Sequence, residues 1–120
     1  MKKIYVDTPN GKRMHGYVYK EKFMRVIESK YVRWSDRAFT VNSTAIPQIE
    51  KLGVETLVFF YKKKDGVELR IIPLGTALWE FSIVSNEHGE KNLRVPMEAT
   101  KLVKELTHDQ FAKEFKSKMK

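Results

Sequence analysis

Residues 54–74 read VETLVFFYKKKDGVELRIIPL, and this stretch decides the fold of the chain. Two runs rich in apolar, β-branched and aromatic residues, 54–62 and 67–74, flank a polar segment that ends in Asp65-Gly66. An Asp-Gly pair favours the tight turn of a hairpin. Because apolar residues occupy successive positions in both runs, we expect strands that are covered on both faces. The stretch therefore predicts a hairpin at the centre of a sheet.

The rest of the chain predicts further strands. Ile4-Tyr5-Val6 and Gly16-Tyr17-Val18-Tyr19 flank Asn10-Gly11, a pair that favours a second hairpin. The segment 23–27 has both helical and strand spacing, but its β-branched and aromatic residues favour a strand. Additional strands are expected at 31–34, 38–41, 77–84 and 93–95.

Helices are expected near position 47 and at the C-terminus. Proline suits a first helical turn and glycine favours a helix end, so Pro47 and Gly53 predict a short helix over 47–52. From Pro96 to Leu106 the apolar residues recur at helical spacing. Thr107-His108-Asp109-Gln110 matches a capping box, which predicts a second C-terminal helix from 108 to about 118.

Strands that come first and helices that come last are typical of an α+β protein. We expect a curved antiparallel sheet of hairpins, with a short helix near 47–52 and two C-terminal helices. The 120 residues match the size of one domain, and no repeat or linker divides them, so residues 1–120 are predicted to form a single domain.

Composition excludes several kinds of site and location. The chain has no cysteine, which excludes disulfides and thiolate metal sites. No run approaches the roughly 20 apolar residues that span a bilayer, and the N-terminus lacks the apolar region of a signal peptide. We therefore expect a cytoplasmic protein that does not enter a membrane. Few Asn and Gln residues together with abundant Lys and Glu favour a heat-adapted source.

The sequence offers no motif that assigns a cofactor, a metal or a catalytic residue. Neither a G-x-x-x-x-G-K-[ST] nor a G-x-G-x-x-G run occurs, and there is no G-x-S-x-G elbow. His15, His88 and His108 lie far apart in the chain, without the short spacing of zinc ligands. The sequence therefore favours a protein that is not an enzyme.

A small metal-dependent nuclease is the best enzymatic alternative. Glu28-Ser29-Lys30 has the E-x-K spacing at which a carboxylate and a lysine share one face of a strand, and Asp7 offers an upstream carboxylate. Two carboxylates can hold a divalent cation that activates water. Such spacing arises readily by chance in a chain with 32% charged residues, so we expect these residues not to form a metal site.

The strongest functional signal is a localised positive charge. Residues 1–40 carry ten Lys or Arg against four Asp or Glu, a net +6 out of +8 for the whole chain. Aromatic residues are interleaved with these cations, and exposed rings stack on unpaired bases. The predicted nucleic-acid-binding residues are Lys12, Arg13, Lys20, Lys22, Arg25, Arg33, Trp34 and Arg37.

These residues predict a small, basic, non-enzymatic protein that binds nucleic acid, mainly by contacting phosphates through its N-terminal third. Trp34 or Tyr19 is the expected stacking ring, and the sequence leaves open whether each of them belongs to the surface or to the core. The alternative is a protein-interaction or regulatory module that recognises the acidic surface of a partner handling nucleic acid. The sequence leaves open the strandedness of the nucleic acid and the oligomeric state.

Overall fold

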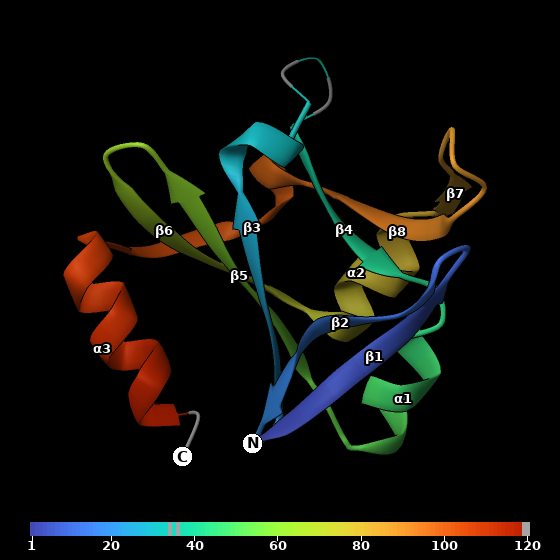
Figure 1. The fold of residues 1–120 in the computed structure, drawn as a ribbon, viewed down its shortest axis with the longest axis horizontal. Coiled ribbons are helices and arrows are strands. Elements are labelled where there is room, and N and C mark those ends of the chain that lie inside the picture. The colour runs from blue at the N-terminus through green and yellow to red at the C-terminus, as the bar shows by residue number, and fades with distance from the viewer. Residues whose placement is uncertain (34, 36, 119–120) are drawn as a thin grey trace.

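The computed structural model describes residues 1–33, 35 and 37–118, which form a mixed α+β fold with two sheets (Figure 1). The strands are β1 (Lys2–Thr8), β2 (Gly11–Tyr19), β3 (Lys22–Glu28), β4 (Ala38–Asn42), β5 (Thr56–Lys63), β6 (Gly66–Pro73), β7 (Ile83–Ser85), β8 (Lys91–Pro96) and β9 (Lys101–Leu106). The helices are α1 (Ile46–Lys51), α2 (Leu74–Glu80), α3 (His108–Lys118) and the 3-10 turns η1 (Ser29–Tyr31) and η2 (Met97–Ala99).

The large sheet has the strand order β1-β2-β3-β5-β6-β9, and the small sheet has the order β4-β8-β7. All neighbouring strands are antiparallel except β3 and β5, which are parallel. The prediction of one antiparallel sheet is therefore wrong in two respects: there are two sheets, and the large one contains a parallel pair. Parallel neighbours need a long crossover, and here the crossover carries β4 and α1 before the chain returns to the large sheet. The strong curvature expected from the sequence stays a prediction.

The strand pair predicted at 54–74 is confirmed, and it occupies an inner position in the large sheet. Strands β5 and β6 pair antiparallel from Thr56↔Pro73 to Lys63↔Gly66, and each has a further neighbour on its other side. Alternation along β5 sends Phe59 into a core shared with the small sheet, α1 and α2, while Phe60 enters a second core against α3. Both faces of this pair are therefore covered.

The expected strand at 31–34 is wrong over its described residues. Tyr31 belongs to η1, and Val32 and Arg33 are in no strand; Trp34 lies outside the described residues. The short turn η1 ends β3 instead, and the chain then enters β4 at Ala38. The strand expected at 38–41 and the helix expected over 47–52 are both confirmed.

Half of the strand expected at 77–84 is a helix, since residues 77–80 belong to α2. Pro73 closes β6 because it has no N–H for a sheet, and α2 follows at once from Leu74 to Glu80. Leu74 and Ala77 are buried at helical spacing, with Leu78 and Phe81 packed against the same core. Only Ile83–Ser85 remains as a strand, the exposed edge β7 of the small sheet.

The first of the two expected C-terminal helices is also wrong. After η2, residues Lys101–Leu106 form β9, which pairs with the free edge of β6. Its side chains are mainly exposed, including Leu102 and Val103. Main-chain pairing with β6, which satisfies the backbone groups of both strands, therefore prevails over the helical spacing of the side chains.

The capping box that starts α3 is confirmed. The Gln110 N–H donates to Thr107 Oγ1 at 3.1 Å, and the Thr107 N–H donates to Gln110 Oε1 at 2.9 Å. Phe111 is buried and Phe115 packs beside it, so α3 covers the second core. Replacing Thr107 by alanine should lower the free energy of unfolding by about 0.5–2 kcal/mol, because the Gln110 N–H loses its acceptor. Chemical unfolding followed by circular dichroism measures this loss, and unchanged stability would contradict it.

Within the described residues, no helix has the length and apolar character that crossing a bilayer requires.

Candidate functional site

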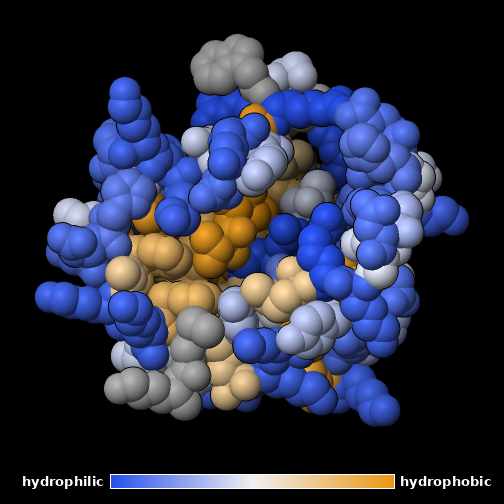
Figure 2. Space-filling view, in the orientation of Figure 1, coloured by the Kyte–Doolittle hydropathy of each residue, from blue (hydrophilic) through white to orange (hydrophobic). Residues whose placement is uncertain are grey.

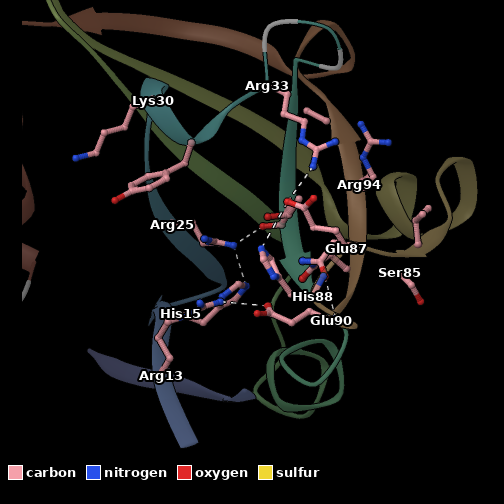
Figure 3. Close-up of a pocket in the computed structure, with 16 residues that line it drawn as sticks. Arg13, His15, Arg25, Lys30, Arg33, Ser85, Glu87, His88, Glu90 and Arg94 are labelled. Carbon is pink, nitrogen blue, oxygen red and sulfur yellow. Dashed lines mark hydrogen bonds and ion pairs between the residues drawn. The ribbon is translucent and has the colours of Figure 1, made fainter. Parts of the chain in front are cut away.

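A polar cleft of about 710 Å³ lies between strands of the two sheets (Figure 3). In the space-filling view a hollow near the centre is bordered by mostly hydrophilic residues on one side and by apolar surface toward α3 on the other (Figure 2). The cleft is lined by Arg13, His15, Arg25, Lys30, Tyr31, Arg33, Ala38, Thr40, Val84, Ser85, Asn86, Glu87, His88, Glu90, Asn92 and Arg94.

Alternation in the small sheet supplies one wall of the cleft. On β4, Phe39 and Val41 are fully buried in the core, so Thr40 between them points the other way and lines the cleft. On β8, Arg94 lies between the buried Leu93 and Val95 and is the register partner of Thr40. The same strands therefore build the core with one face and the cleft with the other.

A bulge in β2 supplies the opposite wall. Ile4 pairs with Gly16 and the next residue, Tyr5, pairs with Met14, so His15 has no partner in the β1–β2 register. This extra residue changes the alternation of β2 and places Arg13 on the same face as Gly16. Without the bulge, regular alternation would send Arg13 to the other face of the sheet.

Gly16 allows the close approach of β2 and β3 next to this bulge. A Cβ atom at this position would lie 2.7 Å from ring atoms of Phe23 and 2.7 Å from the Met24 carbonyl oxygen. The Phe23 ring instead stacks on the His15 imidazole, with 6.0 Å between the ring centroids. Glycine is thus required here by packing.

His15 and Arg25 form the floor of the cleft, and both bind the exposed edge of β4. The Asn42 N–H donates to His15 Nε2 at 2.9 Å, and Arg25 Nη1 donates to the Thr40 carbonyl oxygen. Arg25 Nη1 also lies 2.9 Å from His15 Nε2. The two side chains thus satisfy main-chain groups that an edge strand otherwise leaves open.

The environment of the floor lowers the pKa values of both His15 and Arg25. Burial, with the nearby charges of Arg25 and Arg13, lowers the pKa of His15 to about 2. Burial, with the charge of Arg13, also lowers the pKa of Arg25 to about 9. At neutral pH His15 is therefore neutral and Arg25 is charged.

A loop from Asn86 to Glu90 lines the cleft, and we call this part of the cleft its mouth; the side chains of Glu87 and Glu90 extend from it toward Arg33 and Arg13 (Figure 3). Asn86 Oδ1 accepts hydrogen bonds of 2.9 Å from the backbone N–H groups of His88 and Glu90, which holds the turn in shape. The loop carboxylates form two ion pairs of 3.4 Å, Glu90 with Arg13 and Glu87 with Arg33. The loop is therefore tied to both sides of the cleft through exposed arginines.

Three of the predicted binding residues, Arg13, Arg25 and Arg33, meet in this cleft although they come from β2, β3 and the segment after η1. The others lie elsewhere. Lys12 is the register partner of Asp7, Lys20 lies in the turn between β2 and β3, and Lys22 is the first residue of β3. Arg37 Nη2 contacts Met97 Sδ at 3.5 Å. Trp34 lies outside the described residues. Whether any of these residues binds nucleic acid stays a prediction.

The aromatic residues of the N-terminal third divide between core and surface. Phe23 and Phe39 are core residues, and Tyr17 and Tyr19 are partly buried against the second core, which answers for Tyr19 the question that the sequence leaves open. Tyr31 is 74% exposed at the cleft, and Lys30 Nζ lies 5.1 Å from the centre of its ring. Tyr31 is thus the exposed ring that lines the cleft within the described residues, whereas Tyr5, which is 47% exposed, does not line it.

Sequence reasoning missed His15, Arg94 and the 86–90 loop as parts of the site. For Arg94 a signal was present, because the polar Asn92 and Arg94 alternate with the apolar Leu93 and Val95. For His15 the sequence contains no such signal, because its position in the cleft depends on the bulge, which arises from the pairing of β1 with β2.

The residues of the nuclease alternative do not gather in the cleft. Glu28 Oε2 pairs with Lys30 Nζ at 3.4 Å on the surface, and Asp7 lies on the edge strand β1. Within the parts of the chain that the structure describes, no group of three His, Cys, Asp or Glu residues is placed to hold a metal ion. Glu68 and Arg70, which are also two residues apart, form an ion pair of 2.7 Å, and Lys63 pairs with the same carboxylate at 2.8 Å.

Comparison of the chain with protein-family models, with curated proteins and with solved structures finds no match.

Proposed function

We propose that this protein binds nucleic acid through the cleft and acts without catalysing a reaction on it. The observation that carries the proposal is the Arg25 guanidinium. It is charged at neutral pH, it lines the floor of the cleft, and its described hydrogen-bonding partners, the Thr40 carbonyl and His15 Nε2, are both neutral. A cation that is partly buried and has no carboxylate partner is costly, and an anionic ligand offsets that cost.

The charge around Arg25 supports an anionic ligand. Five Lys or Arg side chains line the cleft against two glutamates, and Lys30 also pairs with Glu28 outside the lining, so positive charge prevails on one concave surface. Such a surface concentrates the field and raises the rate at which polyanions associate. Phosphate contacts made by lysine and arginine release counterions, and they supply most of the affinity in sequence-independent binding.

Tyr31 supports a preference for single strands. Its ring is 74% exposed beside the cationic Lys30, and no described aromatic contact covers it. An exposed ring beside a phosphate-binding surface is the arrangement on which unpaired bases stack. In a duplex the bases are already stacked on one another, so only the phosphate contacts remain.

A titration with labelled oligonucleotides tests this function. We expect Arg13→Gln combined with Arg33→Gln to weaken binding of single strands of any sequence and to lower the slope of log K against log salt by about 0.7 per lost phosphate contact. The slope is measured by fluorescence anisotropy between about 50 and 200 mM salt. Both side chains are more than half exposed, so the fold should tolerate the change.

The matched control is Lys20→Gln combined with Lys22→Gln. This variant also removes two positive charges, one from the β2–β3 turn and one from the start of β3, and neither lysine lines the cleft. A larger loss in the arginine variant supports the cleft as the site, whereas equal losses favour a diffuse contact with the basic N-terminal third. Metal-dependent cleavage of the oligonucleotide that disappears in Glu28→Gln would overturn the non-enzymatic part of the proposal.

A second candidate function, protein interaction, is favoured by Trp79. This residue of α2 is 90% exposed, and the exposed Ile83 and Val84 follow on the edge strand β7. Exposed tryptophans are common at the centres of protein interfaces. No binding of either single or double strands at low salt would reject the nucleic-acid proposal and favour this one.

A further inference from the structure

The floor of the cleft contains two hydrogen-bond donors that lack acceptors. His15 Nε2 accepts from the Asn42 N–H, so the neutral imidazole carries its proton on Nδ1. Both His15 Nδ1 and Arg25 Nε are buried, and neither has a hydrogen-bonding partner among the described residues. His15 as a whole is only 7% exposed. Unsatisfied buried donors are rare in folded proteins and call for an explanation such as a bound ion.

The distribution of carboxylates adds a second observation. Both glutamates of the cleft lie on the loop at its mouth, where they pair with Arg13 and Arg33. Within the described residues, no carboxylate forms an ion pair with Arg25. Positive charge is therefore matched at the mouth and unmatched at the floor.

We propose that the floor of the cleft binds a phosphomonoester group, the terminal phosphate of a nucleic-acid strand. The assignment to a strand end rests on the proposed function. The phosphomonoester itself is inferred from the unmatched charge of Arg25 in the cleft lining, and the buried donors His15 Nδ1 and Arg25 Nε show that the floor is short of acceptors. A terminal phosphate carries nearly two negative charges at neutral pH and presents three acceptor oxygens, whereas a phosphate inside a strand carries one charge. The cleft volume of about 710 Å³ falls in the range of small-molecule pockets, so it has room for the end of a strand.

The loop from Asn86 to Glu90 regulates access to this site. Its ion pairs to Arg13 and Arg33 are both 3.4 Å long. The Glu87–Arg33 pair is exposed on both sides and adds little to stability, whereas the Glu90 side chain, paired with the exposed Arg13, is only 16% exposed. An incoming phosphate competes with Glu87 and Glu90 for the two arginines. The arginines then turn from the loop to the ligand, while Arg25 stays in place through its bond to the β4 edge.

The test compares one short single strand in three forms, with a 5′-phosphate, with a 3′-phosphate, and with hydroxyl groups at both ends. We expect one phosphorylated form to bind about tenfold or more tightly than the hydroxyl form, as charge-assisted hydrogen bonds predict. Inorganic phosphate and a nucleoside monophosphate, used as competitors, show whether the phosphate alone or the strand end is recognised. Equal binding of all three forms would overturn the inference and leave the proposed function intact.

Variants separate the floor from the mouth. Arg25→Gln should abolish the preference for the phosphorylated end, and Arg37→Gln, which removes the same charge outside the cleft, should keep it. Because Arg25 also holds β4, its loss could unfold the chain, so a second variant leaves the floor untouched. Glu87→Gln with Glu90→Gln should tighten binding of the phosphorylated form more than Glu50→Gln with Glu55→Gln does, and equal effects would contradict the site.

The two proposals fail in different ways. Tight binding of the nucleoside monophosphate without binding of any oligonucleotide would reject the nucleic-acid function and the strand end, and would retain a phosphomonoester pocket for a small molecule. Oligonucleotide binding that Arg25→Gln leaves unchanged, in a folded variant, would reject the pocket.

Discussion

Phe59→Ala should lower the free energy of unfolding by about 3–5 kcal/mol, a large part of the stability of a small domain. The ring is 1% exposed and stacks on Phe39 of the small sheet, with 4.6 Å between the centroids. Its removal leaves a cavity between the two sheets that the surrounding strands cannot close. Unfolding in urea, followed by circular dichroism, measures the loss.

Phe60→Ala should cost a similar amount on the opposite face of the same strand. Phe60 is also 1% exposed, and its ring contacts Phe111 and Phe115 of α3 at centroid distances of 5.1 and 5.9 Å. The control is Trp79→Ala, which removes a 90% exposed ring and should change stability by less than about 0.5 kcal/mol. An unchanged melting temperature in both phenylalanine variants would mean that neither ring belongs to a core.

Stability should also fall as the pH is lowered from about 6.5, with a slope of about 1.4 kcal/mol per pH unit that originates from His15. In the unfolded chain a histidine takes up a proton near pH 6.5. In the folded protein, burial and the charges of Arg25 and Arg13 lower the pKa of His15 to about 2. Between these values the unfolded state binds one more proton, so acid favours unfolding.

The measurement is the free energy of unfolding between pH 6.5 and 5. His15→Gln should reduce the slope, because an amide oxygen can still accept from the Asn42 N–H but does not titrate. His88→Gln removes an exposed histidine of the loop and is the control. Glu68 and Glu114 do not titrate in this pH interval. Burial raises the pKa of each carboxyl group, but hydrogen bonds from basic residues outweigh it and lower both pKa values, so both groups titrate below pH 5. The same slope in His15→Gln and the unmodified protein would contradict this assignment.

Local signals predicted the parts of the fold that depend on neighbouring residues. The turn at Asp65-Gly66 and the apolar runs beside it were enough for the β5–β6 pair, since both strands lie next to each other in the chain. The same holds for the capping box of α3, in which Thr107 and Gln110 are three residues apart. In both cases the partners are close in sequence, so little chain entropy opposes their contact.

Local side-chain spacing gave the wrong prediction at β9, because the pairing partner of this strand is distant in the sequence. The helical spacing of 99–106 is real, but the segment pairs with β6, about 35 residues earlier in the chain, because that strand has an open edge. Strand β3 likewise pairs with β5, although β4, which belongs to the small sheet, and α1 lie between them in the chain. Side-chain spacing carries no information on which edge is free.

The candidate site divides in the same way. The sequence by itself determined that the N-terminal third is strongly basic, and that Arg13, Arg25 and Arg33 are part of that charge. Only the tertiary structure decided that these three meet with Arg94 in one cleft, while Lys12, Lys20, Lys22 and Arg37 stay outside it. The physical reasons are two contacts between strands. The bulge at His15 determines the face of β2 on which Arg13 lies. The unpaired edge of β4 holds Arg25 and His15 in place through hydrogen bonds with the Thr40 carbonyl and the Asn42 N–H.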